Sequence, residues 1–138
     1  MGLDTFPVHA VGVVESPVAD PRHAALQGDE SDIESAIRIH ESAAPAAADL
    51  RPGGRVVVLT WLHLADREVL AVHPRGDQSR PLTGVFSTRS QDRPNPIGLH
   101  EVEIVAVEPE RLLVRGLEAI DGTPVLDIKP VLEPQGSR

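Results

Sequence analysis

The stretch Arg55-Val-Val-Val-Leu-Thr-Trp-Leu-His-Leu64 decides the fold class of this chain. It is a nearly continuous apolar run, which is typical of a strand buried on both faces, as in a barrel or in the centre of a sheet. Turn residues at Arg51 to Gly54 come directly before it. We expect Glu68 to His73 to be its antiparallel partner, because the link from Ala65 to Arg67 is short enough for a hairpin.

Further strands are expected on both sides of this run. Val8 to Val14 and Ser35 to His40 are predicted strands, and the second is half-exposed because apolar and polar residues alternate in it. Pro109-Glu110 joins two later segments closely enough for an antiparallel hairpin. The later apolar segments are Gly84 to Phe86, Ile97 to Glu108, Leu112 to Val114 and Val125 to Leu132. Strands at short spacing with little helix predict a mostly β fold, a small and largely antiparallel barrel or sandwich with short helical and loop insertions.

In the segment Ile97 to Glu108, the alternation of apolar and polar residues changes phase. Ile97 and Leu99 share one parity, whereas the apolar residues from Val102 onward have the other. A β-bulge near His100 or Glu101 would accommodate that change.

Two connecting segments have their own patterns. Ala19 to Asp32 is polar and is expected to be a loop, and Pro74 to Thr83 is expected to be another because it has no apolar period. Ser42 is a candidate cap for a short helix from Ala43 to Leu50, in which Pro45 is tolerated only in the first turn.

The composition limits the class of protein. A length of 138 residues fits one domain, so residues 1–138 are expected to form a single domain with no C-terminal extension domain. Aromatic residues make up 2%, so aliphatic side chains must fill the core. The absence of cysteine excludes disulfides, thiolate nucleophiles and cysteine-based zinc sites. No apolar run reaches the roughly 18 to 20 residues needed to span a bilayer, so no membrane partner and a cytoplasmic location are expected.

The charge is negative overall and unevenly distributed. A formal net charge of −8 argues against a general nucleic-acid binder, which needs broad positive charge to displace phosphate counterions. Residues 1–50 have two basic and nine acidic side chains, residues 51–100 have seven and four, and residues 101–138 have four and eight. The positive excess therefore lies in the central segment, where a focused field could guide an anionic ligand.

The central segment also contains the densest unusual stretch, Thr88 to Gly98 (TRSQDRPNPIG). Two prolines bracket Asn95 and hold it in an extended conformation. Arg89 and Arg93 offer forked donors that suit carboxylate or phosphate. A rigid loop with such donors favours a ligand site, while the alternative is a proline-stiffened connector with two solvated arginines.

A second candidate begins at Asp121-Gly-Thr-Pro124 and continues as Val125-Leu-Asp-Ile-Lys-Pro130. Gly122 can adopt the positive φ that a turn needs. Asp127 and Lys129 are two apart on a predicted strand and so share one face of the sheet. The alternative is a hairpin turn followed by a structural ion pair.

Other kinds of site find little support. No histidine pair has the spacing of a zinc helix, so no metal site is expected. The sequence has no GxSxG elbow, no P-loop and no GxGxxG, so any nucleotide cofactor would be held by something other than a Rossmann turn. His63 lies at the end of the buried run, where the residues alone favour a core histidine over a catalytic one.

Taken together, these motifs resemble the TsaA/TrmO family, also called YaeB-like, over roughly residues 8 to 132. The resemblance rests on the order of five pieces, and the last two are highly specific as a pair. The pieces are Val11-Gly12-Val13 to Ser16-Pro17, Trp61-Leu-His63, Gly84 to Ser90, Arg93-Pro-Asn-Pro-Ile-Gly98 and Asp121 to Pro130.

The resemblance implies an S-adenosylmethionine-dependent methyltransferase on a small β-barrel instead of a Rossmann fold. Characterised members methylate the exocyclic amine of threonylcarbamoyl-adenosine beside the tRNA anticodon, and bind the cofactor near a dimer interface. A homodimer with the tRNA anticodon loop as partner is therefore expected. The alternatives are a methyltransferase with a small-molecule acceptor and a cofactor-binding module without turnover.

By matching position, the resemblance also implies roles for individual residues. The catalytic group would be His63, Arg93, Asn95 and Asp127. Substrate contacts would come from Arg89, Arg93 and Lys129. Cofactor contacts would come from Phe86, Ser87, Thr88, Arg89, Ser90, Pro96, Ile97, Gly98, His100, Asp121, Thr123 and Leu126. In this hypothesis the region of Asp121 or Asp127 anchors the cofactor and the two arginines hold the anionic part of the acceptor, so Arg93→Ala would impair turnover more than cofactor binding.

Overall fold

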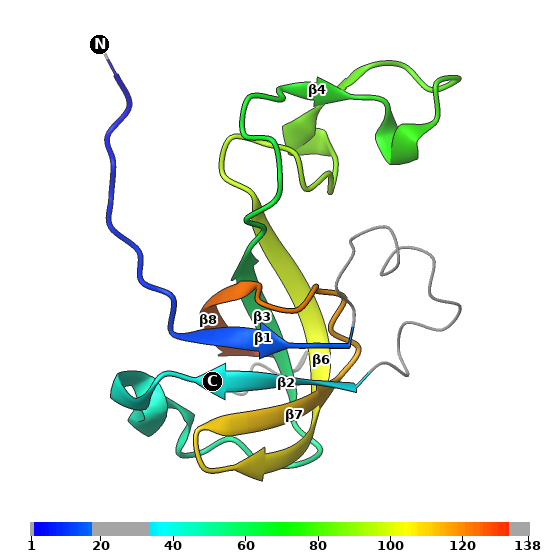
Figure 1. The fold of residues 1–138 in the computed structure, drawn as a ribbon. Helices are drawn as coiled ribbons and strands as arrows, with labels where there is room; N and C mark the ends of the chain where they lie inside the picture. The colour runs from blue at the N-terminus through cyan, green and yellow to red at the C-terminus, as the bar shows by residue number, and fades with distance from the viewer. Residues whose placement is uncertain (1, 18–33, 133–138) are drawn as a thin grey trace.

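The computed structural model describes residues 2–17 and 34–132, and within them the chain forms a closed antiparallel barrel of six strands with a small lobe above it (Figure 1). The order around the barrel is β1-β2-β7-β6-β3-β8. The strands are β1 (Gly12–Glu15), β2 (Glu34–Ile39), β3 (Arg55–Trp61), β6 (Ile97–Glu108), β7 (Arg111–Arg115) and β8 (Pro124–Pro130). The prediction of a mostly β, largely antiparallel barrel is therefore confirmed.

Strand β3 has a paired neighbour on each side. It pairs with β6 along its whole length, from Arg55 opposite Glu103 to Trp61 opposite Ile97, and with β8 on its other side. The ring closes where β1 pairs with β8, with Gly12 opposite Val125. Closure pairs the outermost strands and leaves no open sheet edge in the barrel.

The hydrophobic core of the barrel contains aliphatic side chains and no aromatic one among the described residues, as the scarcity of aromatic residues predicted. The aromatic side chains of Phe6 and Phe86 are exposed and that of Trp61 is half-buried. The core consists of Val14, Ile37, Ile39, Val56, Val58, Val102, Ile104, Leu112, Val114, Leu117, Ala119 and Val125. Branched side chains suit this interior because they pack well on a pleated surface.

The lobe is an insertion between β3 and β6. It contains the two-stranded sheet of β4 (Ala71–Val72) and β5 (Thr83–Gly84), and the short 3-10 turns η3 (Pro74–Gly76) and η4 (Val85–Ser87). Figure 1 shows it standing above one end of the barrel. The chain leaves and re-enters the barrel at Trp61 and Ile97, which are paired.

The expected partner of β3 was wrong. Residues 68–73 do not form a hairpin with it, because β4 pairs with β5 inside the lobe and the neighbours of β3 are β6 and β8. The expectation that β3 is buried on both faces was also too strong. Alternate residues Val56, Val58 and Thr60 are buried, whereas the outward-facing ones are half-buried and Arg55 is exposed.

The bulge in β6 exists, but it lies further along than expected. Gly98, Val102 and Ile104 share one parity and are buried, while Ile97 and Leu99 point outward and are 44% and 51% exposed. No change of phase is therefore needed at His100 or Glu101. The register shift comes between Ile104 and Ala106, where β6 pairs with β7.

The two remaining local predictions need smaller corrections. The first strand begins at Gly12 instead of Val8 and extends to Glu15. The predicted helix is a 3-10 helix, η2 (Glu41–Ala47), and its N-cap is His40, whose ring accepts a hydrogen bond from the backbone of Ser42. The hairpin at Pro109-Glu110 is confirmed. The predicted loop from Ala19 to Asp32 lies outside the described residues. No helix among the described residues has the length and apolar character needed to cross a membrane.

Candidate functional site

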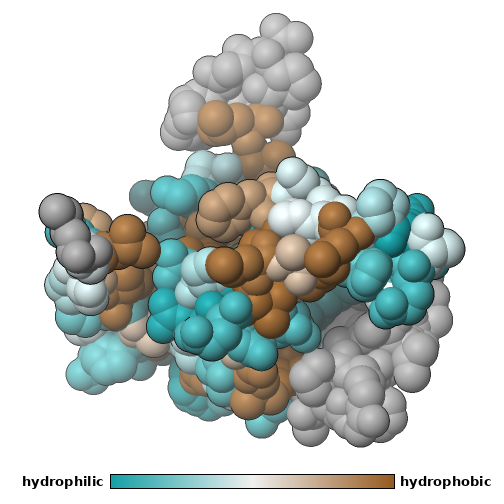
Figure 2. Space-filling model, turned by 90° about the horizontal axis from the view of Figure 1, so that it is seen from above, coloured by the Kyte–Doolittle hydropathy of each residue, from teal (hydrophilic) through white to brown (hydrophobic). Residues whose placement is uncertain are grey.

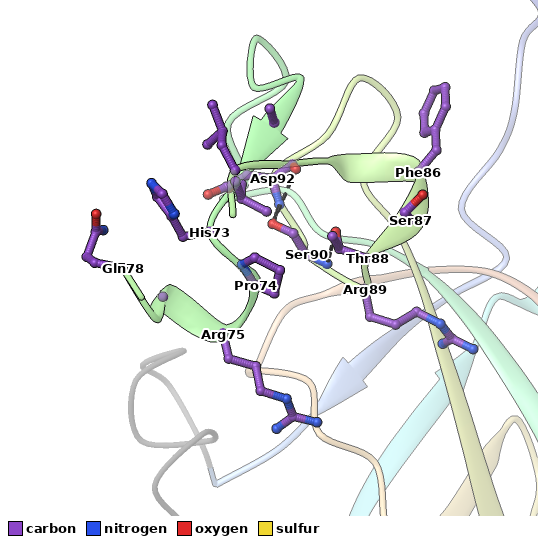
Figure 3. A pocket seen from close by; sticks show the side chains of 14 residues that line it. His73, Pro74, Arg75, Gln78, Phe86, Ser87, Thr88, Arg89, Ser90 and Asp92 are labelled. Atoms are coloured by element: carbon purple, nitrogen blue, oxygen red, sulfur yellow. Dashed lines mark hydrogen bonds between the residues drawn. The ribbon is translucent and has the colours of Figure 1, made fainter. Parts of the chain in front are cut away.

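The lobe contains an open cleft of about 970 Å³ (Figure 3). Two segments form it: one runs from β4 through η3, and the other from η4 into the TRSQDRPNPIG loop. The lining residues are Ala71, Val72, His73, Pro74, Arg75, Gly76, Gln78, Leu82, Phe86, Ser87, Thr88, Arg89, Ser90 and Asp92. The volume falls within the range of small-molecule and cofactor sites, roughly 300 to 1,000 Å³.

Arg67 fixes the loop from outside the cleft. Its Nε donates to the carbonyl of Pro94 at 2.7 Å, and its Nη2 donates to Oδ1 of Asn95 at 2.9 Å. The same guanidinium lies 5.0 Å from the centre of the Trp61 ring, which places a cation over an aromatic face. The position of Asn95 therefore depends on Arg67 as well as on the flanking prolines.

A series of side-chain to backbone hydrogen bonds shapes the start of this loop. The hydroxyl of Thr88 accepts from the backbone of Ser90, and the hydroxyl of Ser90 accepts from the backbone of Asp92. The carboxylate of Asp92 in turn accepts from the backbone of Asp66 at 2.8 Å. Serine and threonine stabilise non-helical backbone in this way, so the loop has a defined shape.

Arg93 supports the same loop from inside. Its Nη2 donates to the carbonyl of Val85 and, at 2.7 Å, to the carbonyl of Thr88. These two carbonyls bracket the turn that carries Phe86 and Ser87. Its Nε is buried without a partner among the described residues. Arg93 therefore holds η4 in place, since charged donors make the stronger hydrogen bonds.

Several groups remain free to meet a ligand. The Phe86 ring is 87% exposed at the edge of the cleft. In Figure 3, Arg75 and Arg89 extend to one side of the cleft, and Phe86 and His73 lie away from them. The cleft thus offers an aromatic ring, hydroxyl groups, two guanidinium groups and the carboxylate of Asp92.

Below the lobe, Gly98 lies in a tight polar contact at the mouth of the barrel. Thr60 lies opposite it on β3, and the Thr60 hydroxyl and His100 Nε2 are hydrogen-bonded at 2.8 Å. A Cβ atom at Gly98 would lie 2.7 Å from His100 Nε2 and closer still to the Thr60 hydroxyl. Only glycine fits here without displacing its neighbours.

Acidification is expected to weaken the fold through His100. Burial lowers the pKa of His100 from its ordinary 6.5 to about 4. Between these pH values the unfolded chain binds a proton that the folded chain does not. The contribution of neutral His100 to the free energy of unfolding is therefore fully present above about pH 6.5 and is lost as the pH falls towards 4. The loss amounts to about 3 kcal/mol at most, at 1.36 kcal/mol for each pKa unit. Urea unfolding between pH 4 and 7 measures it. His100→Gln should flatten the pH dependence, and an unchanged slope in that variant would contradict this assignment.

The cleft brings together part of the site expected from sequence. Arg93, Asn95 and Pro96 belong to the loop that shapes it but do not line it, while Ile97, Gly98 and His100 belong to β6. Their roles as ligand contacts stay predictions. The expected cofactor residues that line the cleft are Phe86, Ser87, Thr88, Arg89 and Ser90.

The second motif lies on the barrel, outside the lining of the cleft. The Asp121 carboxylate accepts from the backbone of Ser16 at 2.9 Å, and Thr123 is buried with its hydroxyl donating to the carbonyl of Ile120. Gly122 has a φ of 86°, as the turn prediction required. The roles assigned to this motif stay predictions.

Further along β8, the ion pair expected on one face is present. Lys129 Nζ lies 3.2 Å from the Asp127 carboxylate, and both side chains are exposed. Leu126 occupies the position of a register shift against β3. The roles of Leu126, Asp127 and Lys129 as ligand contacts also stay predictions.

Two residues differ from what the sequence pattern suggested. His63 is exposed, so its interpretation as a core histidine was wrong, and it does not line the cleft. Arg67 was not singled out at all, because its partners are 27 and 28 residues away. The missed wall of the cleft around Arg75 had one signal, the isolated basic run from His73 to Arg80. Among the described residues no cluster of three or more histidine, aspartate or glutamate side chains could hold a metal ion.

Known proteins resemble this chain along most of its length. It is 48% identical over 126 residues to a probable S-adenosyl-L-methionine-binding protein of Methanothermobacter thermautotrophicus, covering 91% of this chain and 90% of that protein. It is 45% identical over 119 residues to an S-adenosyl-L-methionine-binding protein of Archaeoglobus fulgidus, covering 86% and 84%.

Solved structures of TrmO share the fold. One matches with a TM-score of 0.72 and 29% identity over 96% of this chain and 57% of the TrmO chain. The structure of TrmO from Pseudomonas aeruginosa matches with a TM-score of 0.72 and 28% identity over 95% of this chain and 58% of its own. This chain therefore spans less than two thirds of the TrmO chains it resembles.

The family model of the tRNA-methyltransferase O N-terminal domain matches residues 13–135, which include the whole lobe and all of the barrel except Gly12 at the start of β1. This chain therefore belongs to the family of the tRNA-methyltransferase O N-terminal domain.

Proposed function

We propose that this protein is an S-adenosylmethionine-dependent N-methyltransferase that acts on the exocyclic amine of threonylcarbamoyl-adenosine next to the tRNA anticodon. The observation that carries the proposal is the coincidence of the matched family domain with a built cleft, whose wall is the TRSQDRPNPIG loop. The names of the two archaeal relatives support the cofactor.

The groups in the cleft fit such a cofactor. An exposed aromatic ring at Phe86 can stack on an adenine, and the Ser87 hydroxyl can bind a ribose. The Asp92 carboxylate can face the ammonium of a methionine moiety, since only one of its oxygens is used by the backbone of Asp66. An aromatic ring, a hydroxyl and a carboxylate are therefore present within one cavity.

The chemistry asks mainly for alignment. When bound, S-adenosylmethionine supplies a methyl group already activated by its sulfonium. The protein has to hold the acceptor amine in line and to keep water away, which converts a bimolecular reaction into an intramolecular one. Arg67 and Arg93 serve this purpose by fixing the loop from its two sides. With its Oδ1 held by Arg67, Asn95 keeps its amide N–H groups as donors towards the acceptor.

A carboxylate can take the proton that the amine loses. Asp92 is the carboxylate that lines the cleft, and Asp127 is the one that the resemblance implies. Arg89, together with the central positive segment, favours an anionic acceptor.

Two measurements test the proposal. Calorimetry is expected to show S-adenosylmethionine binding to the purified chain, and nucleoside mass spectrometry is expected to show loss of methylated threonylcarbamoyl-adenosine in tRNA from a strain lacking the gene. Reintroducing the gene should restore the methylated nucleoside. An unchanged nucleoside with intact binding would contradict the tRNA acceptor and leave a small-molecule acceptor or a binding module, whereas absence of binding would contradict all three.

A homodimer is part of the proposal. Seen from above, the face that carries the lobe shows apolar groups among hydrophilic ones (Figure 2). The large apolar side chains exposed in the lobe and at the start of β6 are Leu64, Leu70, Leu82, Phe86, Ile97 and Leu99. Exposed apolar groups on the face that carries the lobe favour a protein partner over bulk water. Light scattering on the sample used for calorimetry measures the mass, and a monomer at working concentration would contradict a shared site.

A further inference from the structure

The five arginines of the lobe differ in what their guanidinium groups contact. Arg67 and Arg93 are occupied by the loop, and Arg80 lies 3.8 Å from the carboxylate of Asp77. Within residues 2–17 and 34–132, the guanidinium groups of Arg75 and Arg89 have neither a hydrogen bond nor an ion pair. Both belong to the lining of the cleft.

The two free arginines come from different segments but serve one space. Arg75 is in η3 and Arg89 follows η4, and Figure 3 shows both side chains extending to the same side of the cleft. The carboxylate of the lining, Asp92, accepts from the backbone of Asp66 and neutralises neither of them. Two unpaired cations at one opening create a local positive field in a chain of net charge −8.

The backbone at Arg75 adds an independent observation. Arg75 has a φ of 57° and a ψ of 24°, a left-handed conformation that costs energy for any residue with a Cβ atom. Gly76 follows with a φ of 69°, so two consecutive residues of this turn have a positive φ, and only the second of them is a glycine. His73 Nδ1 and the carbonyl of Arg80 lie 2.8 Å apart and hold together the two ends of the segment 73–80, which contains this turn. A strained residue that is kept in place by its surroundings points to function.

The geometry points to Arg75 and Arg89 as a clamp for the phosphate backbone of the RNA acceptor. This inference rests on the proposed function and adds to it a residue, Arg75, that contacts the acceptor outside the reacting base. Guanidinium groups suit this role because their planar fork matches phosphate oxygens and they stay charged at all relevant pH values. The two contacts would set the direction in which the anticodon loop enters the cleft, since phosphate contacts fix register and orientation.

The test compares the salt dependence of RNA binding. An anticodon stem-loop RNA is titrated by fluorescence anisotropy at several salt concentrations, with saturating S-adenosylhomocysteine present. Arg75→Gln and Arg89→Gln should each weaken binding about three- to fivefold, and each should reduce the slope of log K against log salt by about 0.7 to 0.9. Arg80→Gln is the matched control, because it lies in the same lobe but is paired with Asp77 and does not line the cleft. It should change neither quantity.

Two further readouts separate the clamp from the fold and from the proposed function. Arg75→Gly should melt at or above the wild-type temperature, because glycine relieves the left-handed conformation, and should still lose RNA affinity as Arg75→Gln does. Wild-type RNA binding with an unchanged slope in Arg75→Gln would overturn the clamp alone. Absence of RNA binding by the wild type, with cofactor binding intact, would overturn the clamp and the tRNA acceptor together.

Discussion

Replacement of Gly98 by alanine is expected to destabilise the barrel by about 1 to 3 kcal/mol, and to lower the melting temperature by about 5 to 10 °C. An added Cβ atom would meet the Thr60 hydroxyl and His100 Nε2, and would lie 3.2 Å from a methyl carbon of Leu62. Thr60 and His100 cannot move freely, because their side chains are hydrogen-bonded to each other on adjacent strands. Thermal unfolding monitored by circular dichroism measures the change.

The matched control for this substitution is Gly84→Ala. Gly84 has a φ of −58°, and the nearest atom to a Cβ there is a carbonyl oxygen 4.0 Å away. Alanine should be neutral or slightly stabilising at that position, because it reduces the freedom of the unfolded chain. Thr60→Ala should also lessen the cost of Gly98→Ala, so the two substitutions should be non-additive. Additive costs would contradict the steric explanation.

Arg93→Ala is expected to lower S-adenosylmethionine affinity and methyl transfer together, each by about tenfold or more, since charged hydrogen bonds contribute about 1.5 to 3 kcal/mol. The loss follows from the two carbonyls, of Val85 and Thr88, that would be left without their charged donor. The turn that presents Phe86 to the cleft would then lose its fixed shape. Calorimetry and single-turnover kinetics measure the two quantities.

This result would differ from the one expected from sequence, in which Arg93 holds the acceptor and turnover falls more than binding. Arg93→Lys should recover part of both losses, because an ammonium group can still donate to a carbonyl. Arg80→Ala, a control in the same lobe, should leave both unchanged. Unaltered cofactor affinity with reduced turnover in Arg93→Ala would contradict the positioning role and favour direct contact with the acceptor.

The sequence predicted the elements of the barrel better than their partners. Alternation and branched residues are local signals, so the runs around Val58, Ile37 and Val102 were recognised as strands. The pairing of β3 with β6 was missed because it depends on Trp61 meeting Ile97 across the whole lobe. A short link to Glu68 looked like a hairpin since nothing in the local pattern shows that residues 62–96 fold separately.

The misplaced bulge has a related cause. A bulge was expected because Ile97 and Leu99 are apolar but have the opposite parity to Val102, and a bulge would bring both sets to the same face of the sheet. In the structure the inward residues nearest the lobe are Gly98 and His100, neither of which a hydropathy pattern assigns to a core. The apolar pair faces outward at a candidate protein interface, where a rule that places apolar residues inside fails.

The site could be predicted where it is continuous in sequence. The loop from Thr88 to Gly98 was identified by its prolines and arginines, and five of the expected cofactor residues line the cleft. The opposite wall around Arg75 and the support from Arg67 come from segments that are distant in sequence. Their contribution depends on how the lobe folds, which local residue types do not reveal.

The attachment of the lobe has a consequence for how relatives diverge. The lobe begins directly after Trp61 and ends directly before Ile97, and these two residues are paired in the barrel. Its length therefore does not affect the register of any barrel strand. Insertions, deletions and exchanges between those points alter one surface unit and leave the barrel's pairing intact. Under the proposed function, the cleft that receives the acceptor lies within this unit, so chimaeras that exchange residues 62–96 between family members are expected to transfer acceptor preference while keeping the barrel.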